Sequence, residues 1–65
     1  MISILRYSIY FTPNGNGEIV FLLQDEPTER TTGFISPQAI AAAAAVLSLK
    51  NIAYNLQTGM FAGHS

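Results

Sequence analysis

Few residues of this 65-residue chain are suited to acid–base or nucleophilic chemistry. The single histidine, His64, is the penultimate residue, and there is no cysteine. Such catalysis needs a base beside a nucleophile and a third group that orients the base. No constellation of this kind is visible, and a histidine in a terminal tail is usually a bystander. We therefore expect a protein that is not an enzyme.

Three of the four carboxylates, Asp25, Glu26 and Glu29, lie close together in one polar segment. Their oxygens are ligands that a hard cation accepts. However, the segment lacks the alternating Asp or Asn positions and the central glycine of a calcium loop, and it contains Pro27. We interpret it as a solvated acidic loop and expect neither a metal nor a cofactor.

Two Asn-Gly pairs at residues 14–17 could be mistaken for a phosphate-binding glycine loop, but no lysine follows them. They separate two segments, 3–11 and 17–24, whose side chains alternate as in strands. A two-residue loop would split the apolar side chains between both faces of the hairpin. A loop of residues 13–15, with glycine in the left-handed position, keeps them together.

This register pairs Leu5 with Leu23, Tyr7 with Phe21 and Ile9 with Ile19. One face of the hairpin is then continuously apolar and is expected to form the core. Its members are Leu5, Tyr7, Ile9, Phe11, Ile19, Phe21 and Leu23.

The opposite face of the hairpin is mixed rather than polar. Four of its side chains would form an apolar patch in water, and such patches mark interaction sites. The candidate partner interface consists of Ile4, Tyr10, Val20 and Leu22.

A loop over residues 25–35 precedes a strong helix start, because Ser36 can cap the first turn and Pro37 suits the first helical position. The alanine-rich segment that follows predicts a helix over 37–50. We expect the hairpin on one side of this helix and a partner subunit on the other. The alternative is an alanine helix half exposed to water.

The segment after residue 50 fits two periods. It can continue the helix to Thr58, with Gly59 as its C-terminal cap, or it can form a short strand over 52–57. We favour the strand because a third strand makes the sheet less marginal. Residues 60–65 are expected to be a tail that is frayed or that docks through Met60 and Phe61.

The predicted fold is a single α+β domain over residues 1–65, with a ββα layout and a short third strand. Ordering 65 residues costs on the order of 100 kcal/mol, which a chain this short barely recovers by burying its own apolar surface. Without cysteine, and with one histidine, neither disulfides nor a structural metal is available as reinforcement. A partner subunit is therefore the expected source of additional stability.

The function that these observations predict is protein interaction. A net charge of −1 argues against nucleic-acid binding, and the longest apolar run, residues 39–47, is short of the roughly 20 residues that a membrane span needs. We expect a cytoplasmic homodimer or higher oligomer that associates through the outer sheet face or through a strand edge. The alternative is a ligand-binding or inhibitor-type regulator of a separate macromolecule, acting through the mixed face or the 25–35 loop.

Overall fold

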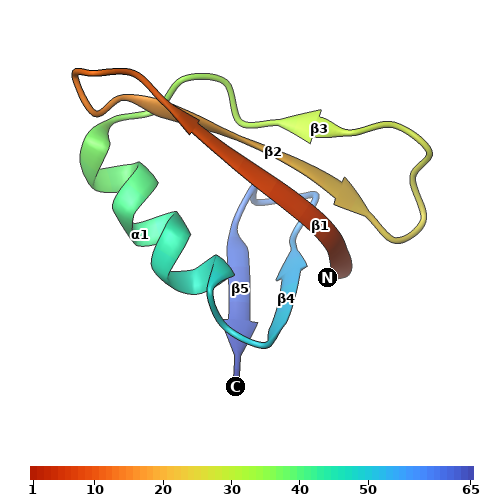
Figure 1. The fold of residues 1–65 in the computed structure, drawn as a ribbon. Helices are drawn as coiled ribbons and strands as arrows, with labels where there is room; N and C mark the ends of the chain where they lie inside the picture. Colours follow the sequence, from red (N-terminus) through yellow and green to blue (C-terminus); the bar gives the residue numbers. More distant parts are fainter.

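One antiparallel five-stranded sheet and one helix form an α+β fold (Figure 1). The computed structural model describes residues 1–65. The elements are β1 (Ile2–Phe11), β2 (Gly17–Leu23), β3 (Arg30–Thr31), α1 (Pro37–Leu47), β4 (Asn51–Tyr54) and β5 (Phe61–His64). The strand order is β3-β2-β1-β4-β5. The expected ββα layout with a third strand is thus incomplete, because β3 lies in the segment predicted as a loop and β5 in the predicted tail.

The turn between β1 and β2 has the expected three-residue form. The N–H of Gly15 donates to the carbonyl of Thr12 at 2.9 Å, and the N–H of Thr12 donates to the carbonyl of Asn16 at 2.7 Å. Gly15 has φ 91°, in the left-handed region that glycine adopts without strain. The predicted register is confirmed for residues 7–11, which pair with residues 21–17.

A bulge at Leu5 changes the register toward the N-terminal end of β1. Arg6 pairs with Leu22, but Ile4 pairs with Leu23, so Leu5 has no partner in β2. An extra residue moves the side chains before it to the opposite face of the sheet. The expected pairing of Leu5 with Leu23 is therefore wrong: Leu5 is 59% exposed, and Ile4 lies in the core with 7% exposure.

Helix α1 begins as the capping residues predict. The N–H of Ala39 donates to the hydroxyl of Ser36 at 3.2 Å, and Pro37 occupies the first turn. The helix ends at Leu47, three residues earlier than expected, and it packs mainly against β5 and secondarily against β2. Its alanines at 41, 42 and 45 stay exposed, so within one chain the helix is half exposed, as the alternative interpretation described.

The segment after the helix forms a hairpin, not a helical extension and a tail. The favoured strand is present as β4, although it is shorter than the predicted 52–57. The side-chain oxygen of Asn55 accepts from the N–H of Gln57 at 2.9 Å and organises the turn. The expectation of a frayed tail is wrong, because β5 pairs with β4 along four residues. Docking is confirmed for Phe61, which packs against Phe21, but not for Met60, which is exposed.

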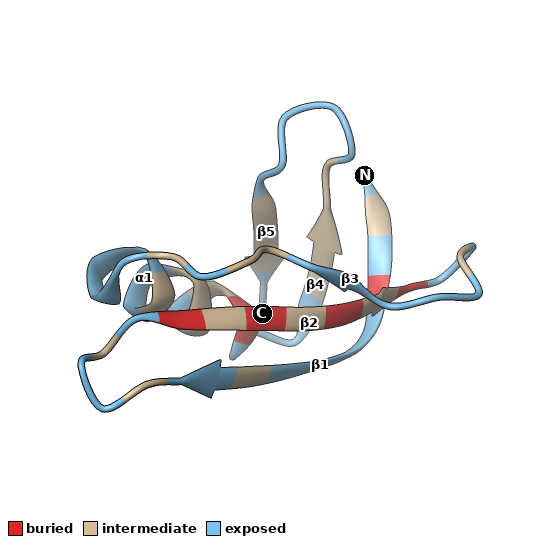
Figure 2. Ribbon diagram, turned by 90° about the horizontal axis from the view of Figure 1, so that it is seen from above, coloured by how far each residue is buried: buried red, intermediate tan, exposed pale blue.

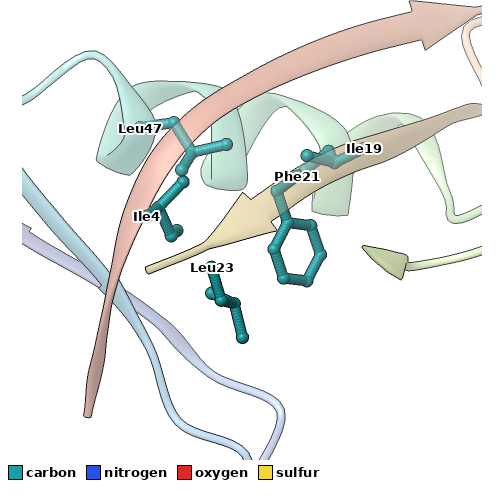
Figure 3. Packing of buried hydrophobic residues seen from close by; sticks show 5 residues of the cluster. All are labelled: Ile4, Ile19, Phe21, Leu23 and Leu47. Carbon is teal, nitrogen blue, oxygen red and sulfur yellow. The ribbon is translucent and has the colours of Figure 1, made fainter. Parts of the chain in front are cut away.

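The core lies on one face of β2, where α1 and the β4–β5 hairpin cover it. Its buried members are Ile4, Ile19, Phe21, Leu23 and Leu47 (Figure 3). The ring of Phe21 packs against Tyr54 and Phe61, with centroids 4.7 and 5.1 Å away. The C-terminal hairpin thus supplies the aromatic contacts that the helix alone, with its small alanines, does not.

Candidate protein interface on strand β1

Strand β1 exposes apolar side chains along most of its length. Nine large apolar side chains are exposed in the whole protein, and β1 holds four of them: Leu5, Tyr7, Tyr10 and Phe11. Figure 2 shows the contrast with β2, where buried and half-buried residues alternate. Tyr7 and Phe11 were expected under the helix, and this expectation is wrong: Phe11 is 72% exposed. Helix α1 packs against β2 instead, and the aromatic rings of the β4–β5 hairpin pack on Phe21 of β2.

One edge of β1 is also open. On the side away from β2, strand β4 pairs only with Ile2 and Ser3. No strand lies beside the remainder of β1 on that side. Figure 2 shows the C-terminal half of β1 at the margin of the molecule with no other segment beyond it. Residues 5–11 therefore form a free edge, and we use this name for them below.

The backbone groups that point out of the free edge follow from the ladder. The N–H of Thr32 donates to the carbonyl of Ile19 at 3.1 Å, and the N–H of Ile19 donates to the hydroxyl of Thr32 at 3.1 Å. Since Ile19 makes these bonds away from β1, its partner Ile9 directs its own N–H and C=O away from β2. Because the direction of these backbone groups alternates along a strand, the N–H and C=O of Tyr7 and Phe11 also point away from β2.

The outer face of the hairpin carries three of the four predicted interface residues. Tyr10 is 57% exposed, and Val20 and Leu22 are half-buried. The fourth, Ile4, was placed there incorrectly, because the bulge at Leu5 moves it into the core. The outer-face patch is therefore smaller than the sequence suggests.

Charged side chains on and beside this face are mostly partnered. Arg6 Nε lies 3.7 Å from a carboxylate oxygen of Glu29, and the hydroxyl of Thr31 donates to Glu18 at 2.8 Å. Both contacts are exposed to water, so each contributes little to stability. Their effect is to hold charged groups at the border of the apolar side chains.

The acidic loop contains a bidentate ion pair. Arg30 donates from two of its nitrogens to the two carboxylate oxygens of Glu26, one at 2.8 Å. This hydrogen bonding lowers the pKa of Glu26 below its usual 4.5 and raises the pKa of Arg30. Glu26 thus has a cationic partner, and no group of three or more His, Asp or Glu side chains gathers anywhere in the structure.

Two hollows open on the surface. One, at the N-terminal end of β1, is lined by backbone and side chains of β4 and β5 and includes Lys50 and His64. The other opens between α1 and the β4–β5 turn, and Tyr54 and Phe61 form its floor with alanines 39 and 43 at its side. The first reaches the buried Ile4 beside exposed groups near both termini, whereas the second reaches the aromatic part of the core.

The sequence indicated the outer-face patch, but it did not indicate which residues of β1 form the free edge. Which part of β1 stays unpaired depends on where β4 ends, and that is a tertiary property. One signal was readable: residues 2–11 contain a single charge, Arg6, and no proline.

The helix α1, with 11 residues, is not long enough to cross a membrane. Comparison of the chain with protein-family models, with curated proteins and with solved structures gives no match.

Proposed function

We propose that this protein is a small, non-enzymatic interaction module that works in the cytoplasm as a homodimer or higher oligomer. The observation that carries the proposal is the exposure of Leu5, Tyr7, Tyr10 and Phe11 on one strand of the sheet. Tyr7 and Phe11 lie on one face of β1 and Tyr10 on the other, so these exposed apolar groups flank one strand instead of being scattered singly, as is typical of association surfaces.

The total surface supports the same conclusion. A folded monomer of 7.0 kDa is expected to expose about 4,000 Å², and this chain exposes 4373 Å². Only six of the 65 residues are buried. The fold alone therefore buries few of its side chains, and association would bury more of the apolar ones.

The sparse charge also favours association. Only seven side chains of Asp, Glu, Lys or Arg are present, and Arg6 is the sole one in β1. Interfaces are depleted in charge at their centres because burying an unpaired ion is costly. An interface on β1 would cover the exposed aromatic rings without burying more than this one cation.

The solution mass tests the proposal. We expect light scattering on a size-exclusion column, across a hundredfold dilution, to show a dimer or larger species that dissociates on dilution. Tyr10→Glu and Phe11→Glu should shift the equilibrium to monomer. The matched control is Leu56→Glu, which places the same charge on a similarly exposed apolar residue in the β4–β5 turn. A folded wild-type monomer at every concentration would overturn the proposal.

The hollow between α1 and the β4–β5 turn, called the groove below, favours a second candidate function. In this function the protein binds a ligand or inhibits a separate macromolecule. The end of the 25–35 loop borders this groove through Thr31, Thr32 and Ile35. An apolar floor with hydroxyls at its border resembles small-molecule sites in general composition. A fluorescent apolar probe that binds the wild type but not Ala43→Phe, which would fill the groove, tests this candidate.

A further inference from the structure

We infer that the free edge of β1 pairs with the free edge of a second copy, antiparallel and centred on Ser8, to give one continuous sheet through two molecules. This inference rests on the proposed self-association and names the surface and the register. It concerns the edge of the sheet, whereas the outer-face patch of Tyr10, Val20 and Leu22 lies on its flat side.

The free edge lacks the features that normally block strand addition. Sheet edges are usually protected by being short, by charges, by proline or by a covering segment. The two outermost strands of this sheet are short, with two residues in β3 and four in β5. The free edge is seven residues long, holds one charge and no proline, and no segment covers it.

Backbone hydrogen bonding is self-complementary at one register. A two-fold axis at Ser8 places Tyr7 opposite Ile9 of the second copy, and Ile9 opposite its Tyr7. These are the residues whose N–H and C=O point out of the edge, so each pair can exchange two backbone bonds. Phe11 then lies opposite Leu5 of the second copy, and both of these exposed side chains gain apolar neighbours.

Neighbouring registers fit less well. An axis at Arg6 would place the two Arg6 side chains opposite each other, which is unfavourable. An axis at Tyr7 would bring Phe11 opposite Ser3, whose edge β4 already occupies. An axis at Ile9 would shorten the paired segment from residues 5–11 to residues 7–11. The Ser8 register uses the whole free edge and avoids both conflicts.

Charges at this register are complementary. Arg6 lies opposite Tyr10 of the second copy, where its cation can contact an aromatic ring. Within each molecule Tyr10 pairs with Glu18 on β2, and the carboxylate of Glu18 lies on the same outer face. Arg6 of each copy therefore approaches Glu18 of the other, and the two-fold axis repeats the contact. A second copy is favoured over an unrelated strand because it supplies both partners.

A disulfide at the axis tests the register directly, because the chain has no cysteine of its own. At the Ser8 register the two Ser8 residues form a non-hydrogen-bonded pair, whose Cα atoms are about 4.5 Å apart. This distance lies within the range that a disulfide spans. We expect Ser8→Cys to oxidise to a covalent dimer at least about tenfold faster than Ser48→Cys, a matched exposed serine at the end of α1, because pairing raises the effective thiol concentration.

A mixture of two variants checks the register independently. Arg6→Cys combined with Tyr10→Cys should give a mixed disulfide in preference to either symmetric one. If Arg6→Cys instead forms a symmetric dimer as readily, the Ser8 register is wrong. Because Arg6 and Tyr10 are both exposed, neither change removes a core contact.

The same samples separate failure of the inference from failure of the proposed function. A non-covalent dimer of the wild type, with Ser8→Cys oxidising no faster than Ser48→Cys, would overturn edge pairing and leave self-association standing through another surface. A wild-type monomer at every concentration would overturn both. A monomer whose Ser8→Cys variant crosslinks only to a different protein would also refute the inference, since a second copy is the occupant we name.

Discussion

Strands β1 and β2 belong to one hairpin and have similar alternating apolar sequences, yet they differ sharply in burial. Every second residue of β2 is buried, from Gly17 to Leu23, whereas β1 buries only Ile4 among its ten residues. Strand β2 has neighbours at both edges. Its inner face packs against α1 and against the aromatic rings of the β4–β5 hairpin. The comparison teaches that burial here is decided by neighbours and not by the apolar pattern alone.

The strongest test of this contrast uses a directly paired couple of aromatic residues. Phe21→Ala should lower the free energy of unfolding by about 3–5 kcal/mol, because it removes a buried ring that contacts Tyr54 and Phe61. Tyr7→Ala, on the facing position of β1, should cost less, about 1–2 kcal/mol in the monomer, because Tyr7 is 38% exposed whereas Phe21 is buried. Urea unfolding at a protein concentration low enough for monomers measures both. Equal losses would contradict the contrast.

The close packing around β2 predicts a second large effect at Gly17. A methyl group there would lie 2.6 Å from the carbonyl oxygen of Tyr10 and 2.8 Å from a side-chain carbon of Ile40. Gly17→Ala should therefore destabilise the fold by about 1–3 kcal/mol. Asn16→Ala, at the exposed neighbouring residue, serves as the control and should stay within about 0.5 kcal/mol of wild type. Thermal unfolding of the two variants and the wild type measures both changes in stability. Equal changes in the two variants would contradict the prediction.

The helix that covers β2 should depend on its cap. Ser36→Ala removes the hydroxyl that accepts from the N–H of Ala39 and should cost about 1 kcal/mol. Ser36→Gly should cost only a few tenths of a kcal/mol, since glycine leaves the first turn open to water. Denaturant unfolding, with the slope compared between variants, is the measurement. An Ala variant as stable as the Gly variant would show that α1 is held by packing alone.

The smallest effect is expected from the ion pair beyond β2. The pKa of Glu26 is lowered by its hydrogen bond from Arg30, so the folded state favours the ionised carboxylate. Its contribution is fully present above the unfolded pKa of 4.5 and is lost as the pH falls through the lower folded value. Arg30→Gln should therefore weaken the fall in stability on acidification, and Lys50→Gln should not. The change is small because the ion pair lies at the surface, where water screens it.

Local chemistry accounts for the features of the fold that the sequence predicted. The three-residue turn depends on Gly15, the helix start on Ser36 and Pro37, and the register on the alternation of a single hairpin. Each involves residues close together in the chain, where steric preferences and single hydrogen bonds decide the conformation. The same is true of β4, whose alternation outweighed the competing helical period.

The features that the sequence did not predict depend on distant contacts. Nothing around Leu5 distinguishes a bulge, so Ile4 was assigned to the wrong face of the sheet. Strand β5 was missed because four residues ending in Gly63 and His64 have little strand character on their own. Gly63 allows close packing against α1, since an added methyl would lie 2.9 Å from the carbonyl oxygen of Val46. The exposed outer face and the free edge of β1 follow from these tertiary choices.

The unequal lengths of the sheet edges limit how far an assembly of this protein can grow. A long edge strand with unpaired backbone groups on both sides of a sheet allows molecules to add one after another, as in a fibril. Here β3 and β5 are too short to continue such a series. A two-fold contact uses the same surface on both molecules and so leaves none for a third. Pairing through β1 would therefore close at two copies and leave no edge for an open-ended polymer.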